Sequence, residues 1–221
     1  MKTHRFRCHA YAGFSLVELL VVIVVLAVLA GILIPSLLRV RQSSLAVECT
    51  NRIRTLGTAV MMYANEHNGT LPEVYQPENG ANYRWARLIM PQLESAELGQ
   101  KEGQDAAKII DCFRCPLDEI ERGDQVSAMC SYGYSFAVQE GDIAGTTKAL
   151  SVYMIEEPSS TILLGDRWMA ANTVNFSVGI DRGRTGNFHM GENSNYFFAD
   201  GHVEALPRTE VIDPSYWQFQ R

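Results

Sequence analysis

The chain has 221 residues and a formal net charge of −6, from 19 basic and 25 acidic side chains. Three of the basic residues lie in the first thirteen, so the rest of the chain carries a side-chain charge of about −9 (−6 less 3). An acidic chain without a Lys/Arg cluster has no electrostatic basis for binding nucleic acid, and we expect none.

The first predicted element is an apolar helix from Phe14 to Leu38. These 25 residues contain one ionisable side chain, Glu18, and follow a basic leader, residues 1–13. About twenty apolar residues cross the hydrocarbon core of a bilayer. The run is longer than the core of a cleaved secretory signal, about 7 to 15 residues. It predicts a retained single-pass anchor, cytoplasmic at its N-terminus because the basic residues precede it.

Glu18 is the unusual residue of this run, because a charge at the bilayer centre costs roughly 2.5 to 3.5 kcal/mol. An ordinary anchor with a chance acid near the interface is one interpretation. However, the stretch from Gly13 through Phe14 and Glu18 to Leu20 resembles the prepilin cleavage and methylation signal of type IV pilins and type II secretion pseudopilins. The placement of Pro35, which removes a backbone donor, agrees with this resemblance.

The resemblance implies a role for each of these residues. A prepilin peptidase would cut between Gly13 and Phe14, and the new amine of Phe14 would be methylated. Glu18 would pair with the N-terminal amine of a neighbouring subunit during assembly. Pro35 would kink the helix, and residues 14–38 would form the spine of a filament.

Beyond the membrane run, apolar residues recur at three- and four-residue steps, which predicts that the helix continues to Asn65. Gly69 and Pro72 then end it. The expected organisation is a leader over 1–13, a membrane and assembly segment over 14–38, a soluble half-helix over 39–65 and an exported domain over 66–221. The roughly 150 residues of that domain suffice for one core.

The sequence of the exported domain predicts short strands and many turns. A short helix is expected near residues 83–91, and strands over 131–136 and 161–166. Residues 195–199 and 202–206 flank Asp200-Gly201, a pair typical of a two-residue hairpin turn with positive φ. The predicted fold class is α+β, with the long N-terminal helix packed on an antiparallel sheet.

A second resemblance rests on motifs in the C-terminal part of the chain. They look like the pilin-like family with a C-terminal processing-associated domain, abundant in planctomycetes and their relatives. The family signature is a histidine, nine residues and Asp-Gly. Ten residues separate His189 from Asp200 here, so the loop is one residue longer. The motifs are Cys115-Pro116-Leu117-Asp118, Ser131-Tyr132-Gly133-Tyr134, Pro158-Ser159-Ser160 before Asp166, and His189 before Phe198-Ala199-Asp200-Gly201-His202-Val203.

His189, Asp200 and His202 are candidates for a metal or acid–base site, since imidazoles and carboxylates serve in both. Asp200 is also a residue type that turns require, and we favour a structural hairpin over a metal site and over catalysis. Calcium stays open as a cofactor, because some similar pseudopilins use it to order a C-terminal loop. Four acidic residues do not match an EF-hand, and we interpret them as a solvated surface: Asp118, Glu119, Glu121 and Asp124.

Cys8 lies in the leader, which leaves four cysteines and three disulfide pairings in an oxidising compartment. Cys112 and Cys115 also have the spacing of a redox motif or half a zinc site, but no second Cys-x-x-Cys completes it. We expect a disulfide from Cys130 to Cys112 or Cys115, with Cys49 packing as a small apolar residue.

The predicted function is structural, not enzymatic: a pilus-like or pseudopilus subunit of the bacterial inner membrane. Its expected partners are the prepilin peptidase and other copies or other pilins in a filament. The exported domain would then be periplasmic or extracellular. One alternative is an anchored binding protein for glycan or another surface polymer that uses the signal only for export, with a site lined by Trp85, Trp168 and Trp217. An anchored hydrolase is disfavoured because no Gly-x-Ser-x-Gly motif is present.

Overall fold

A computed structural model of the chain describes residues 15–73, 84–93, 112–118, 131–135, 139–140, 148–167, 189, 193–207, 209–211 and 213–217. The chain divides into two compact units, residues 1–43 and residues 44–221, and each is described by itself.

Helix α1, Leu16–Glu66, begins in the first unit and ends in the second. In the first unit its side chains are exposed from Leu16 to Val40, although nearly all are apolar. Pro35 lies inside the helix, which continues through it. Among the described residues, α1 is the one helix long and apolar enough to cross a membrane, judged by length and composition. The predicted helix from 14 to 65 is therefore confirmed to within two residues at each end.

In the second unit one face of α1 is buried. Its buried positions recur at helical spacing, which is the stripe that the sequence predicts: Cys49, Ile53, Leu56, Gly57, Ala59, Val60 and Ala64. The helix ends in a Schellman arrangement, with the Gly69 N–H donating to the Ala64 carbonyl at 2.8 Å. Asn68 (φ 56°) and Gly69 (φ 82°) supply the left-handed conformation that this ending requires.

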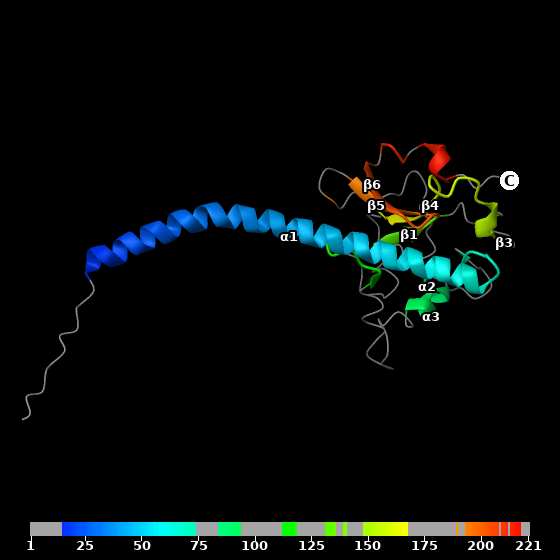
Figure 1. The fold of residues 1–221 in the computed structure, drawn as a ribbon, viewed down its shortest axis with the longest axis horizontal. Coiled ribbons are helices and arrows are strands. Elements are labelled where there is room, and N and C mark those ends of the chain that lie inside the picture. Colours follow the sequence, from blue (N-terminus) through cyan, green and yellow to red (C-terminus); the bar gives the residue numbers. More distant parts are fainter. Residues whose placement is uncertain are drawn as a thin grey trace, which may run out of the picture. The chain divides into compact units, whose positions relative to one another are not determined.

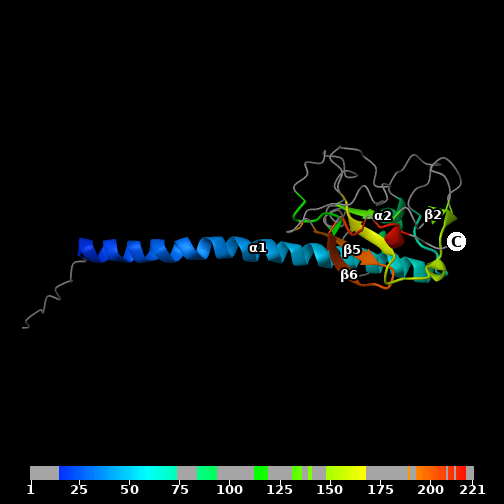
Figure 2. The ribbon, with the colours of Figure 1, turned by 90° about the horizontal axis from the view of Figure 1, so that it is seen from above.

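The stripe packs on a four-stranded antiparallel sheet of order β1-β4-β5-β6 (Figure 1). Its strands are β1 (Tyr132–Tyr134), β4 (Ile162–Asp166), β5 (Asn193–Phe198) and β6 (Val203–Pro207). A separate pair joins β2 (Gln139–Glu140) to β3 (Lys148–Ala149). The α+β class is confirmed. Figure 2 shows the sheet beside the C-terminal half of α1 in a second view.

Both faces of the sheet are covered. Along β5, Phe197 points into the core shared with α1, whereas Tyr196 and Phe198 join a second cluster with Ile162 on the opposite face. Two neighbours on β4, Leu163 and Leu164, both reach the α1 side, where the β4–β5 register shifts. All five residues of β4 are consequently buried, as the sequence predicts for this strand.

The β5–β6 hairpin is confirmed, but its turn differs from the expected two-residue type. Such a turn needs positive φ at both central residues, and in this turn only Gly201 has it (φ 95°). The Gly201 N–H donates to the Phe198 carbonyl at 3.0 Å, which makes Ala199 and Asp200 the central pair. Gly201 then occupies the left-handed bulge position that follows such a turn.

The remaining described elements are short. They are α2 (Arg84–Leu88), α3 (Met90–Leu93) and the 3₁₀ helices η5 (Val152–Met154) and η6 (Pro214–Trp217). The helix expected near 83–91 is thus present as two pieces. Trp85 is fully buried between Phe113 and Tyr134, with ring centroids at 5.7 and 5.4 Å. It belongs to the core and does not line a surface site, while Trp168 lies outside the described residues.

Candidate functional site

At the N-terminal end of α1, Glu18 makes the acid's half of the arrangement called a capping box. Ser15 precedes the helix, and its backbone N–H donates to Glu18 Oε2 at 2.9 Å. Ser-x-x-Glu is the sequence pattern of this box, in which the acid satisfies an orphan donor at the helix start. A carboxylate here also lies at the positive end of the helix dipole. Gly13 and Phe14 lie outside the described residues, so their predicted roles stay predictions.

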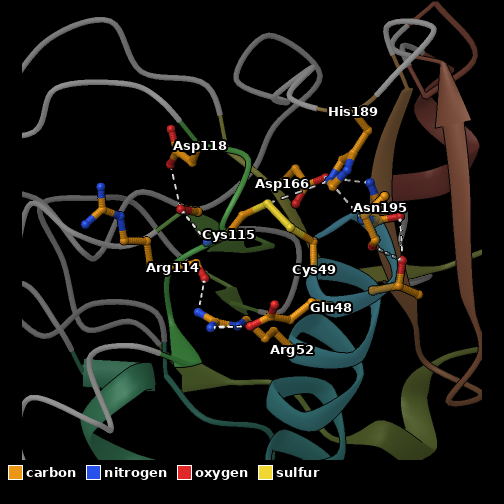
Figure 3. Close-up of a disulfide and its surroundings, with 12 residues drawn as sticks. Glu48, Cys49, Arg52, Arg114, Cys115, Asp118, Asp166, His189 and Asn195 are labelled. Atoms are coloured by element: carbon orange, nitrogen blue, oxygen red, sulfur yellow. Dashed lines mark hydrogen bonds and ion pairs between the residues drawn. A yellow bond between two sulfur atoms is a disulfide. The ribbon is translucent and has the colours of Figure 1, made fainter. Parts of the chain in front are cut away.

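A disulfide joins α1 to the segment before the sheet. Cys49 on α1 is bonded to Cys115, 66 residues later, and both are fully buried (Figure 3). This corrects two expectations: Cys49 is not an unbonded packing residue, and the partner of Cys115 is not Cys130. Cys130 lies outside the described residues, so a bond between Cys112 and Cys130 stays a prediction.

Arg52, one helical turn after Cys49, supports the same connection. Its Nη1 donates to the Arg114 carbonyl at 2.6 Å, and its Nη2 lies 2.6 Å from Glu48 Oε1. The guanidinium therefore joins the exposed rim of α1 to the residue directly before Cys115. A covalent bond and a charge-assisted hydrogen bond hold the two segments side by side.

Ser131 connects two of the motifs on which the sequence resemblance rests. Its hydroxyl donates to Asp118 Oδ2 at 2.6 Å and accepts the Cys115 N–H at 2.8 Å. Asp118 is only 5% exposed, so interpreting it as part of a solvated acidic surface is wrong. Glu119, Glu121 and Asp124 lie outside the described residues. Asp118 can be buried because the Ser131 hydroxyl supplies a hydrogen bond to its carboxylate.

His189 and Asp166 form a buried pair next to the disulfide. His189 Nε2 lies 3.0 Å from Asp166 Oδ2, and the two side chains are 7% and 0% exposed. The same ring nitrogen lies 2.9 Å from the amide nitrogen of Asn195 and 4.0 Å from Cys115 Sγ. In Figure 3 the three side chains point toward one another beside the sulfur atoms.

Burial raises the pKa of the Asp166 carboxyl above its ordinary value. The hydrogen bond and charge of His189, and the Asn195 N–H that donates to Oδ2 at 2.6 Å, offset this increase only in part. Among the described residues, none is a hydrogen-bond partner of the buried atoms Asp166 Oδ1 and His189 Nδ1. The site therefore holds polar atoms whose hydrogen-bonding capacity is not fully used.

Asp200 and His202 form a separate, partly exposed pair at the hairpin turn. Asp200 Oδ1 accepts the His202 N–H at 3.1 Å and lies 2.5 Å from His202 Nδ1. Within the described part of the chain, the three candidates His189, Asp200 and His202 do not form a common ligand group. The atoms that do meet, within 4.8 Å of one another, are the sulfurs of Cys49 and Cys115 and a ring nitrogen of His189.

The sequence identifies His189 and Cys115 as candidates but does not place them together, and it does not indicate Cys49 or Asp166 as site residues. One signal was present: Cys49 is the cysteine on the predicted buried stripe, a position that faces the rest of the domain.

Comparison with known families places two matches on the chain. Residues 8–34 match the prokaryotic N-terminal methylation motif, and residues 39–175 match a family described as a protein of unknown function, DUF1559. The comparisons with curated proteins and with solved structures gave no match. The methylation motif implies processing by a prepilin peptidase, and together with α1 it fits a single-pass membrane anchor.

Proposed function

The chain belongs to the DUF1559 family, and from this premise we propose that it is the structural subunit of a pilus-like or pseudopilus filament. Its role is assembly and not catalytic turnover. The observation that carries the proposal is the methylation motif at residues 8–34, which includes the first part of an apolar helix whose side chains are exposed from Leu16 to Val40.

An apolar surface of this extent must be covered by lipid or by other protein chains. Burial of apolar surface contributes about 25 cal/mol per Å², so a helix of this kind is stable in lipid or against other helices and not in water. The first environment is the inner membrane, where the N-terminus is cytoplasmic and the domain that begins near residue 66 is periplasmic. The second is the interior of a filament made of copies of this helix or of related subunits.

Processing creates the group that Glu18 pairs with. Cleavage between Gly13 and Phe14 leaves an amine at Phe14, which is then methylated and stays positively charged. In the single chain, Glu18 caps its own helix through the Ser15 N–H. In the filament, the carboxylate pairs with the Phe14 amine of a neighbour and sets the register of the two helices. The pairing also neutralises a charge that is costly in an apolar environment.

Pro35 supports release from the membrane. It lacks an N–H, so the carbonyl of Gly31, four residues earlier, has no helical donor from that position. Gly31 itself has a low helix propensity, which weakens the same turn further. The weakened turn allows α1 to bend as it passes from lipid into the filament.

The test is direct observation of filaments. Filaments sheared from native cells are examined by electron microscopy with antibody against the exported domain, and a strain without prepilin peptidase is the control. Labelled filaments that disappear in the peptidase mutant support the proposal. Processed protein that stays in the membrane without filaments overturns it, and supports an anchored binding protein that uses the signal only for export.

A further inference from the structure

Three side chains that are distant in the sequence place metal-binding atoms within 4.8 Å of one another. They are Cys49 on α1, Cys115 before the sheet and His189 before β5. We propose that, when the Cys49–Cys115 disulfide is reduced, these three residues bind one Zn²⁺ ion. The inference is independent of filament assembly and concerns how the exported domain is held together.

The ligand types match zinc. Two thiolates and one imidazole form a recognised zinc set, with Zn–S distances of about 2.3 Å and Zn–N distances of about 2.0 Å. Two thiolates also balance the charge of the ion, which favours binding in a site with little water. Both cysteines are fully buried, and the side chain of His189 is 7% exposed. Thiolate ligands disfavour calcium and magnesium, which prefer oxygen.

The neighbours of His189 support this interpretation. Nε2 is the ring nitrogen that faces Cys115 Sγ, at 4.0 Å, and the carboxylate of Asp166 lies 3.0 Å from it. Asp166 is fully buried, and its Oδ1 has no hydrogen-bond partner in the part of the chain that the structure describes. This carboxylate lies beside His189, where it can hold a water that fills the fourth position on the ion. The Asn195 amide lies 2.9 Å from Nε2 and must release this nitrogen when the ring binds the ion.

The geometric change that binding requires is small. Two sulfur ligands on one tetrahedral ion are roughly 3.8 Å apart, so the sulfurs separate by less than about 2 Å from bonding distance. Cys49 is fixed on a long helix, and Cys115 lies in a segment without regular strand pairing. We expect the Cys115 segment to make the movement, while Arg52 keeps it next to α1 through the Arg114 carbonyl.

The chemistry balances with a dithiol as reductant. A dithiol gives two electrons and two protons to the disulfide, which becomes two thiols while the dithiol becomes a disulfide. Zinc then displaces the two thiol protons and binds the two thiolates. The ion ties α1 to the Cys115 segment, as the disulfide does. A chain that has not yet been oxidised can therefore hold the same two segments together with metal.

The experiment uses the full chain in detergent micelles, reduced and freed of reductant under anaerobic conditions. It is titrated with Zn²⁺ against a chromophoric chelator, and separately with Co²⁺ to record thiolate-to-cobalt absorption. We expect one equivalent per reduced chain and none per oxidised chain. Affinity should fall at least tenfold in Cys115→Ser and in His189→Ala, whereas the matched histidine variant His202→Ala should bind like wild type.

Two results would overturn the proposal. One is a reduced wild-type chain that takes up no zinc. The other is binding that both site variants leave unchanged, which would place the ion elsewhere, for instance on Cys112 and Cys130. If the variants do not fold, the Co²⁺ spectrum of a Cys112→Ser, Cys130→Ser chain decides, because that chain keeps Cys49, Cys115 and His189 and lacks the alternative pair. Absorption from two thiolates in a tetrahedral site supports the assignment, and any other number of thiolates contradicts it.

Discussion

The backbone N–H of Ser15 donates to the carboxylate of Glu18 at 2.9 Å, so the acid that stands out in the apolar run caps the start of its own helix. Capping and intersubunit pairing make different demands on this side chain. A cap needs an acceptor oxygen, which glutamine also provides. Pairing with the amine of a neighbour needs a negative charge.

The first prediction separates these demands with Glu18→Gln and Glu18→Ala. Glutamine keeps the hydrogen bond to Ser15 and loses the charge, whereas alanine loses both. If charge pairing drives assembly, both variants are cleaved normally and both yield few or no filaments, measured by immunoblot of sheared material. Wild-type filament yield in Glu18→Gln, with loss only in Glu18→Ala, would reduce Glu18 to a helix cap.

The second prediction concerns the cleavage position. Gly13→Val should block processing, because a branched side chain stands where the resemblance implies that the peptidase needs a small residue. The matched control is Gly31→Val, a glycine in the same segment whose β-carbon would meet no atom within 4 Å. Gel mobility should show the full-length precursor for Gly13→Val and the shortened product for Gly31→Val. A shortened product from both would contradict the expected requirement for a small residue at position 13.

The third prediction tests the packing of α1 on the sheet. A β-carbon at Gly57 would lie 2.3 Å from the ring of Phe197, which is part of the buried core. Overpacking costs about 1–3 kcal/mol. The better helix propensity of alanine offsets up to about 1 kcal/mol of this cost. Gly57→Ala should therefore lower the free energy of unfolding by about 1–2 kcal/mol in urea titration. Gly31→Ala is the control without a contact, and equal stability of both variants would contradict the packing.

The fourth prediction concerns the disulfide. Closing a loop of 66 residues stabilises a fold by about 4 kcal/mol in the chain-entropy account. Cys49→Ala with Cys115→Ala should lower the free energy of unfolding by a comparable amount. Cys8→Ala, in the leader, should change nothing in the processed protein. Peptide mapping under non-reducing conditions should recover Cys49 linked to Cys115, and a linkage of Cys115 to Cys130 would contradict the structure.

The fifth prediction is a pH dependence at the hairpin. Slight burial raises the pKa of Asp200, but hydrogen bonds and the charge of His202 lower it more, so the net pKa lies below its ordinary value of 3.8. A lowered carboxyl pKa stabilises the fold at pH above 3.8, and this stabilisation is lost as the pH falls through the folded-state pKa. Wild type should lose stability relative to Asp200→Asn below pH 3.8. Parallel unfolding curves at every pH would show that the carboxylate contributes nothing.

Local patterns in the sequence predicted the elements of the fold well. The stripe on α1, the buried strand β4 and the β5–β6 hairpin each follow from spacing over fewer than twenty residues. The turn type was wrong because Asp200-Gly201 fits two geometries, and only the pairing of the strands decides between them. In the observed geometry the central pair begins one residue earlier, at Ala199.

The candidate site was less predictable, because its residues are joined by long-range contacts. Nothing local indicates that Cys49 bonds Cys115, or that Asp166 faces His189. Asp118 belongs to an acidic cluster that does not match an EF-hand, and for such a cluster the sequence predicts a solvated surface. The partner of Asp118, Ser131, lies thirteen residues later in the sequence. The Ser131 hydroxyl bonds both Asp118 and the N–H of Cys115, which lies three residues before Asp118.

The most direct test of the account is the intact mass and N-terminal sequence of the protein recovered from its native membrane. The account predicts a chain that begins at Phe14 with a methylated amine. Recovery of a chain that still begins at Met1, in cells with an active prepilin peptidase, would contradict it.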